Sequence, residues 1–284
     1  MNRRLAAASI ALLPLALAAA SCAPSAEAVA SAEAALHADT AIAAAVDATT
    51  RTEANRARDQ YRHPRETLGF FGVEPDDTVV EIWPGGGWYT EILAPLVAAR
   101  GTLWVAANGN GLNGVRGLME KDPATYGRIR TAAFPAFDAG DARVPDGSAD
   151  VVLTFRNVHN WRMGYQREDK QDYAPEAFAQ IFRMLKPGGV LGVVDHRLPE
   201  SASDEKERSS GYIKVSTVRR LAEAAGFRLA AESEINANPA DTADHPNGVW
   251  TLPPSLRAPE GQRERYLAIG ESDRMTLKFV KPKR

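Results

Sequence analysis

The sequence predicts an α/β fold in which a mostly parallel sheet is covered by helices on both faces. Three observations support this prediction. Short apolar strands alternate with helical segments, a glycine cluster follows the first strand, and no capped helix separates the last two strands. Strands that alternate with helices form parallel sheets buried on both faces, whereas strands joined without a helix can pair antiparallel. With 284 residues, of which 44% are hydrophobic, the chain can bury one main domain of this kind.

The N-terminal residues 1–22 predict a secretory signal peptide. Arg3 and Arg4 precede an apolar run at residues 5–20, which is shorter than the roughly 20 residues of a membrane span. The single cysteine, Cys22, follows Ala-Ala-Ser, so this run resembles a bacterial lipobox with an acylated cysteine. We therefore expect an exported periplasmic lipoprotein that meets the membrane only through Cys22. The alternatives are plain secretion after cleavage at a nearby Ala-x-Ala site and an uncleaved N-terminus.

Composition limits the organisation and the partners of the remaining chain. Residues 23–50 are rich in alanine and predict a partly helical tether to a domain at residues 51–284. The formal net charge is −2 and basic residues do not interleave with aromatic ones, so no nucleic-acid partner is expected. The five histidines have no metal-ligand spacing, and no metal site is expected. A G-x-S-x-G motif is also missing, which disfavours a serine hydrolase.

Apolar runs and turn residues place the elements in order along the chain. Residues 50–61 are compatible with a helix, and Pro64 suits the first turn of a second short helix that ends before Gly72. Strands are then expected at residues 78–82, 102–107, 150–155, 190–195, 227–235 and 275–280, and helices at residues 88–99 and 175–185. A further helix begins with Ser216 or Thr217 as its cap. The proline-rich stretch 236–265 is too long for a hairpin loop, which predicts a lid over the substrate side.

The glycine cluster after the first strand predicts a ligand site. Glu81 lies near the end of that strand, and residues 84–87 read Pro-Gly-Gly-Gly before the next helix. Glycines let the backbone approach a ligand closely, and ligands of open α/β sheets bind at the C-terminal ends of the strands. The third glycine of a dinucleotide fingerprint would fall at Thr90, which argues against a nicotinamide cofactor. The alternative is a purely structural turn.

These motifs resemble those of the class I S-adenosylmethionine-dependent methyltransferases. The acid and the glycine cluster resemble the first motif, and Gly140-Asp141-Ala142, residues 145–152 and residues 185–190 resemble later motifs in the family order. A bacterial group of predicted methyltransferases is matched more closely, by strings at residues 58–64, 81–89, 155–161 and 244–246. The resemblance implies a Rossmann-like three-layer sandwich with seven strands in the order 3-2-1-4-5-7-6 and strand 7 antiparallel. It also implies S-adenosylmethionine as the cofactor and methyl transfer to a small-molecule nucleophile.

The sequence departs from the family pattern after the second strand. Enzymes of this kind usually have an acid there that accepts hydrogen bonds from the ribose hydroxyls, and here only Asn108 is available. A rival interpretation follows, in which the protein is a non-catalytic binding protein of the cell envelope that retains the fold. The cofactor is made in the cytoplasm and the signal peptide sends the chain away from it, which also favours this rival.

The resemblance and the strand ends give two sets of candidate site residues. The candidate cofactor-binding residues are Tyr61, Glu81, Pro84, Gly85, Gly86, Gly87, Tyr89, Asn108, Asp141 and Asn157. The candidate catalytic residues are His159, Asp195 and His196, which follow or end the fourth and fifth strands. His159 suits a general base because its ordinary pKa is near neutral. The alternatives are structural roles: a loop fixed by His159, amides capped by Asp195, a solvated Asp141 and aromatic residues packed in the core.

Overall fold

The computed structural model describes residues 25–283, so the predicted signal peptide and Cys22 lie outside the described residues. The chain divides into a short unit, Met1–Leu36, and a folded unit, His37–Arg284. None of the helices in the described part of the chain is long and apolar enough to cross a membrane.

The folded unit begins inside the stretch predicted as a tether. Helix α1, Ala26–Val46, covers most of that stretch. Its residues Ile42 and Ala45 are buried in the apolar core of the folded unit. The domain therefore starts before residue 51, which is the boundary expected from composition. The alanine-rich composition of this helix did not indicate which of its side chains would be buried.

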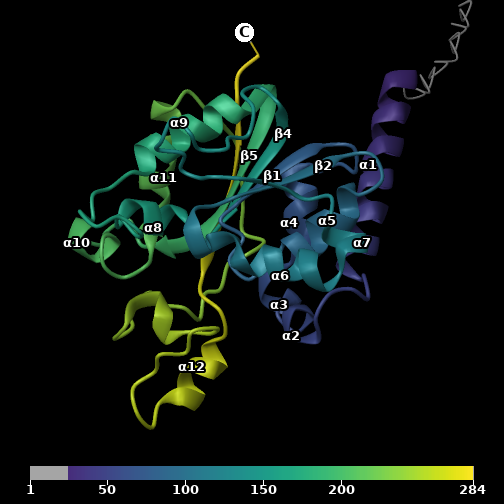
Figure 1. Cartoon of the computed structure of the whole chain (residues 1–284). Coiled ribbons are helices and arrows are strands. Elements are labelled where there is room, and N and C mark those ends of the chain that lie inside the picture. Colours follow the sequence, from purple (N-terminus) through teal and green to yellow (C-terminus); the bar gives the residue numbers. More distant parts are fainter. Residues whose placement is uncertain (1–24, 284) are drawn as a thin grey trace, which may run out of the picture. The chain divides into compact units, whose positions relative to one another are not determined.

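Eight strands of the described chain form one sheet (Figure 1). They are β1 Thr78–Ile82, β2 Thr102–Ala106, β3 Arg130–Ala132, β4 Ala149–Phe155, β5 Leu185–Leu198, β6 Ile213–Lys214, β7 Arg228–Ser233 and β8 Arg274–Val280. The order is β3-β2-β1-β4-β5-β8-β7, and the two-residue β6 pairs with the end of β5. Strand β8 is antiparallel to both β5 and β7. Without β6, this is the order 3-2-1-4-5-7-6 with an antiparallel seventh strand, which confirms the predicted fold class.

Helices cover both faces of the sheet and make it the middle layer of a sandwich (Figure 1). Helices α9 and α11 pack on one face with β1 residues Val80 and Ile82, whereas α4 and α5 pack on the other with Val79. Neighbouring strand residues point to opposite faces, so one apolar strand serves both layers. The helices are α2 Glu53–Arg56, α3 Asp59–Arg62, α4 Pro64–Phe71, α5 Thr90–Val97, η1 Gly109–Leu112, α6 Asn113–Lys121, α7 Pro123–Tyr126, α8 Val158–Arg162, α9 Ala174–Met184, α10 Asp204–Glu207, α11 Val215–Ala224, η2 Gly248–Thr251 and α12 Arg263–Ile269.

Three local expectations differ from the structure. Helix α5 begins at Thr90 rather than at residue 88, because the glycine turn continues to that point. Helix α11 is preceded by Lys214, which makes no side-chain cap; Ser216 instead donates its hydroxyl to Glu200 at 2.5 Å. Helix α12 lies between the last two strands, yet these strands still pair antiparallel, since α12 belongs to an excursion beyond the sheet (Figure 1).

Candidate active site

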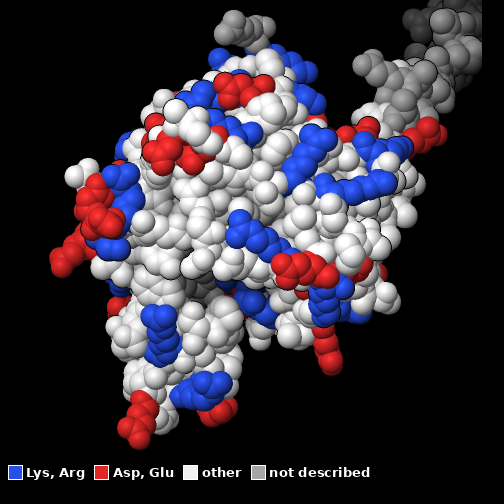
Figure 2. Space-filling model, viewed as in Figure 1, with Lys and Arg blue, Asp and Glu red and all other residues white. Residues whose placement is uncertain are grey.

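A cavity of about 290 Å³ lies at the C-terminal ends of β1, β4 and β5. Its walls come from the region of α2 and α3, the turn after β1, the start of α8, the end of β5 and the segment around η2. In Figure 2 the surface is hollowed between the segment that carries α12 and the rest of the domain. The cavity thus occupies the position at which open α/β sheets bind their ligands.

The turn after β1 exposes backbone to this cavity. Gly85 has a φ of +60°, and a Cβ added to Gly85 or Gly86 would meet nothing within 4 Å. Both residues line the cavity together with Pro84, as the sequence predicted. Gly87 does not line it, because Gly87 faces helix α6, where an added Cβ would lie 2.6 Å from Leu118. Two of the three glycines are therefore open to a ligand, and the third serves the packing of α6.

Glu81 is a buried carboxyl group at the floor of the cavity. The side chain is 2% exposed, and its Oε2 accepts a hydrogen bond from the Thr90 hydroxyl at 2.5 Å. Burial raises the pKa of Glu81 to about 7, against the opposing effect of the Thr90 hydrogen bond. Asn157 lies beside it and donates to the carbonyl of Ile82 at 2.9 Å, which ties the end of β4 to the end of β1.

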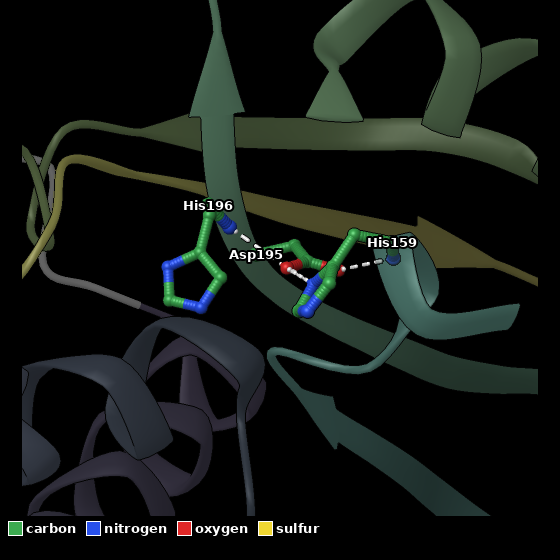
Figure 3. A group of neighbouring side chains, drawn as sticks. All are labelled: His159, Asp195 and His196. Atoms are coloured by element: carbon green, nitrogen blue, oxygen red, sulfur yellow. Dashed lines mark hydrogen bonds and ion pairs between the residues drawn. The ribbon is translucent and has the colours of Figure 1, made fainter. Parts of the chain in front are cut away.

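Asp195 joins His159 and His196 into one buried group (Figure 3). Its Oδ1 accepts from His159 Nδ1 at 2.7 Å and from the His196 backbone N–H at 2.8 Å, and its Oδ2 accepts from the His159 backbone N–H at 3.1 Å. A carboxylate only accepts hydrogen bonds, so Nδ1 of His159 carries the proton and Nε2 is left as an acceptor. His159 and His196 line the cavity, whereas Asp195 lies behind them.

His196 is held as a neutral imidazole. Burial lowers its pKa well below the ordinary value, with smaller contributions from His159 and Arg274. Its Nδ1 lies 2.5 Å from the hydroxyl of Ser272. The ligand atoms of His159, Asp195 and His196 lie within 4.8 Å of one another, and this trio is the one possible metal site among the described residues. Both oxygens of Asp195 already accept N–H groups, which favours an orienting role over metal coordination.

Besides Gly87, three more of the predicted cofactor-binding residues lie away from the cavity. The amide of Asn108 donates to the carbonyl of Pro135 at 2.7 Å and accepts from the Phe134 N–H at 3.1 Å, so both of its ends serve the chain after β3. Asp141 accepts from a backbone N–H within its own loop at 2.9 Å. Tyr61 is 37% exposed and its ring packs against a glycine before β8. Each of these residues was predicted to bind the cofactor from its position in the chain. The sequence did not show that other parts of the fold would contact their side chains.

Tyr89 does line the cavity, as predicted, and its ring stacks on Phe155 at 3.5 Å between ring centroids. The segment around η2 contributes Val249, Trp250 and residues 253–255 to the same cavity. This segment belongs to the stretch 236–265 that the sequence predicts as a lid.

Sequence reasoning missed three arginines that line the cavity. Arg58 and Arg62 approach it from the chain around α3, and Arg156 follows β4. All three stand in the strings that carry the family resemblance, at residues 58–64 and 155–161. Those strings are the signal that could have identified them, but nothing in the sequence indicates that the two segments meet.

Residues 81–193 match the family model described as a methyltransferase domain. This matched segment, which is less than half of the chain, is similar to a methyltransferase domain. The match begins at the buried acid of β1 and ends within β5 before Asp195, so it includes the glycine turn and the end of β4, both of which line the cavity. A methyltransferase domain of this kind implies S-adenosylmethionine as the cofactor.

Solved structures agree with this domain at the level of the fold. An S-adenosylmethionine-dependent methyltransferase from Aquifex aeolicus is 14% identical, with a TM-score of 0.52, over 86% of this chain and 98% of that chain. A putative methyltransferase from Haloferax volcanii, solved with the activator Trm112, is 17% identical, with a TM-score of 0.51, over 81% and 94%. The [4+2]-cyclase SpnF is 15% identical, with a TM-score of 0.52, over 92% and 98%. A comparison with curated proteins finds no match.

The residues around the cavity fit one end of this cofactor. Gly85 and Gly86 form an open cradle, and Glu81 and Asn157 place polar groups beside it. These groups suit the polar amino-acid end of S-adenosylmethionine. At the end of β2 no side-chain carboxylate is present, and both ends of the Asn108 amide are hydrogen-bonded to the chain after β3.

Proposed function

We propose that this protein transfers a methyl group from S-adenosylmethionine to a nucleophilic atom of a small molecule. The observation that carries the proposal is the open glycine cradle beside the buried acid of β1, at the sheet edge spanned by the methyltransferase domain. Glu81, Gly85, Gly86, Tyr89 and Asn157 are the residues that would hold the cofactor.

The protein's contribution to catalysis is mainly positioning. When bound, S-adenosylmethionine supplies a methyl group whose bond to sulfur breaks, with the electron pair left on sulfur, as the acceptor's nucleophilic atom bonds the carbon. Holding two reactants in a reactive geometry can lower a barrier by about 7–11 kcal/mol. Residues from α3, β1, β4 and η2 line the cavity in which the two reactants would be brought together.

His159 is the proposed general base. Its Nε2 is free to accept the proton that an O–H or N–H acceptor loses, because Asp195 holds the proton of Nδ1. The Asp195 carboxylate then stabilises the imidazolium that forms. His196 is neutral and lies with its ring centroid 5.0 Å from that of His159, so it neither repels this charge nor competes for the proton.

Calorimetric titration of the full chain with S-adenosylmethionine and S-adenosylhomocysteine tests this proposal. We expect both to bind, and we expect Glu81→Ala and Gly85→Ala to weaken binding by at least tenfold, about 1.4 kcal/mol. Gly117→Ala is the matched control, since an added Cβ there meets nothing within 4 Å and the residue does not line the cavity. A folded chain that binds neither compound would contradict the proposal.

The second candidate function is a non-catalytic binding protein of the cell envelope. The observation that favours it is the end of β2, where Asn108 replaces the usual acid and its amide is hydrogen-bonded to the chain after β3. The same titration separates the two functions, because only the enzyme requires S-adenosylmethionine to bind.

We also propose that the protein is exported and anchored in the membrane through a lipid on Cys22. The support is the apolar run with two preceding arginines and the Ala-Ala-Ser-Cys string. Expression with a labelled fatty acid tests it: Cys22→Ser should abolish label and release the protein from the membrane fraction. Equal labelling of the variant would contradict the anchor.

A further inference from the structure

Four arginines gather around one carboxylate beside the cavity, and we call this group the arginine cluster: Arg58, Arg62, Arg156 and Arg274. The carboxylate is Glu271, which is 2% exposed. Its oxygens accept from Nε of Arg58 at 2.6 Å, from Nε of Arg62 at 3.1 Å and from Nη2 of Arg274. One negative charge therefore faces several positive charges at the wall of a cavity.

The excess charge raises the energy of the arginines that line the cavity. Burial lowers the pKa of Arg62 to about 8, with Arg156 as the next largest cause, and burial lowers the pKa of Arg156 to about 10. Glu81 also lines the cavity, but its carboxyl group accepts from Thr90 and forms no ion pair with an arginine of the cluster. A buried cationic wall of this kind is stabilised when an anion binds to it.

Donors on this wall lack acceptors. Arg62 is 3% exposed, and its Nη2 is buried with no hydrogen-bond partner among the described residues. Arg156 also lines the cavity, and no carboxylate of the described chain lies within ion-pair distance of it. Guanidinium groups bind planar oxyanions through paired N–H donors, so the missing partner has the chemistry of a carboxylate or a phosphate.

The rest of the cavity limits the size and the character of the ligand. The cavity of about 290 Å³ would also hold the amino-acid end of the cofactor, so the remaining space suits only a small acceptor. Trp83, Tyr89 and Trp250 supply aromatic walls, and His159 lies on the same cavity as the arginines. A ligand with an oxyanion at one end and an apolar body can therefore bind with its nucleophilic atom near His159, the proposed base.

We infer that the methyl acceptor is a small anionic molecule whose carboxylate or phosphate is bound by Arg58, Arg62 and Arg156. This inference rests on the proposed function, because it names the acceptor of that same site. The arginines fix one end of the acceptor, and the end that carries the nucleophilic O–H or N–H then reaches Nε2 of His159.

Binding of simple probes to the full chain tests this inference. Benzoate and inorganic phosphate are titrated with and without saturating S-adenosylhomocysteine, and neutral benzamide has the size of benzoate without its charge. We expect at least one anion to bind in both conditions and benzamide to bind more weakly. In Arg58→Gln and Arg156→Gln the dissociation constant of the anion should rise roughly 10- to 100-fold, because a charge-assisted hydrogen-bond pair is lost.

Two control variants keep the result interpretable. Arg156→Lys retains the charge but not the paired N–H donors, so it should bind the anion more tightly than Arg156→Gln and less tightly than the wild type. Arg65→Gln removes an arginine of α4 that pairs with Asp39 at the surface, and it should leave anion binding unchanged. The affinity for S-adenosylhomocysteine should be the same in all four variants.

Three results would count against the inference or against the proposed function. If neither anion binds, or if both bind the glutamine variants as tightly as the wild type, the inference fails. If the anions compete with S-adenosylhomocysteine and the glutamine variants lose that ligand instead, the arginine cluster binds the cofactor, and the inference fails again. Arginine-dependent anion binding by a chain that binds no S-adenosylhomocysteine would overturn the proposed function and leave the anion site supported.

Discussion

Glu81 pairs in the sheet register with Val105 of β2 and Leu153 of β4, so its carboxyl group is surrounded by apolar strands. This setting, rather than the residue type, gives it a pKa of about 7 and makes its charge sensitive to pH near neutrality. Asp195 is buried just as deeply, but its two oxygens accept three N–H groups. Two buried acids at one sheet edge thus differ in their hydrogen-bond donors: Glu81 accepts from one hydroxyl group and Asp195 from three N–H groups.

Glu81→Gln should change how stability depends on pH. The folded-state pKa of Glu81 is raised from 4.5 to about 7, so the wild type carries no penalty below pH 4.5 and an increasing one as pH rises to about 7. The glutamine variant lacks this penalty. Relative to the wild type, its free energy of unfolding should increase by up to about 3 kcal/mol across that range. Urea unfolding of both proteins at several pH values measures this difference, and a constant difference would contradict the raised pKa.

Asp195→Asn should lower kcat by about 10²- to 10⁴-fold once an acceptor is known, because the amide no longer fixes the proton on Nδ1 of His159. His159→Gln should have a loss of similar size, and the double variant should lose little more, since the two residues act as one unit. Cofactor affinity should be unchanged in each.

The control for this pair is Asp150→Asn. The Asp150 carboxylate also accepts two hydrogen bonds, one from Nζ of Lys186 at 2.6 Å and one from the Thr78 backbone N–H at 2.9 Å. It lies at the end of the sheet opposite to the cavity. Equal losses of kcat in Asp150→Asn and Asp195→Asn would show that the effect is one of general stability.

Helix α6 packs directly on the glycine turn, and glycine is needed on both sides of this contact. A Cβ added to Gly114 of α6 would lie 2.5 Å from the carbonyl oxygen of Gly85 and 2.9 Å from Cα of Gly86. The turn that offers backbone to the cavity is therefore held from behind by a helix that approaches it at close range. The shape of the cradle depends on the position of α6 as a whole element.

Gly114→Ala and Gly117→Ala in α6 should have opposite effects on stability. Gly114→Ala forces the helix away from the turn and should destabilise the protein by about 1–3 kcal/mol. Gly117→Ala places its Cβ in open space and should stabilise it by about 0.5–1 kcal/mol through helix propensity. Urea unfolding measures both, and calorimetry should show weaker cofactor binding in Gly114→Ala alone. A neutral Gly114→Ala would mean that α6 is free to move.

Glu271 links distant parts of the whole molecule. It precedes β8 near the C-terminal end of the chain, and it accepts from Arg58, which is 213 residues away in sequence. Burial by itself would raise the pKa of Glu271, but the charges of Arg274, Arg62, Arg58 and Arg156 together lower it to about 2. The segment before α4 is thereby joined to the last strand of the sheet.

Glu271→Gln should destabilise the folded domain by about 3–5 kcal/mol at neutral pH, because several buried guanidinium groups lose their counter-ion. The folded-state pKa is depressed from 4.5 to about 2, so the stabilisation is complete above pH 4.5 and is lost as pH falls toward 2. Urea unfolding should therefore show the two proteins converging in stability in acid. A difference that persists unchanged at the lowest pH would contradict this role of the carboxylate.

The sequence by itself predicted six strands of the sheet and the edge at which the site lies, and the family resemblance implied the strand order. Apolar runs and glycine turns are local signals, and the family resemblance supplied the antiparallel last strand. Glu81, Asn157 and His159 meet at one cavity for the reason given in advance, which is that the carboxyl ends of parallel strands share one edge. The roles of these side chains stay predictions.

Only the tertiary structure decided which side chains are available to a ligand. In the folded protein the Asn108 side chain is hydrogen-bonded to the chain after β3, and Gly87 faces α6. Arg58 and Arg156 line one wall of the cavity although nearly a hundred residues separate them in sequence. It also buries Ile42 of α1 in the core of the folded unit. These outcomes depend on which surfaces pack together over long sequence separations, and residue patterns report only the local preference of each segment.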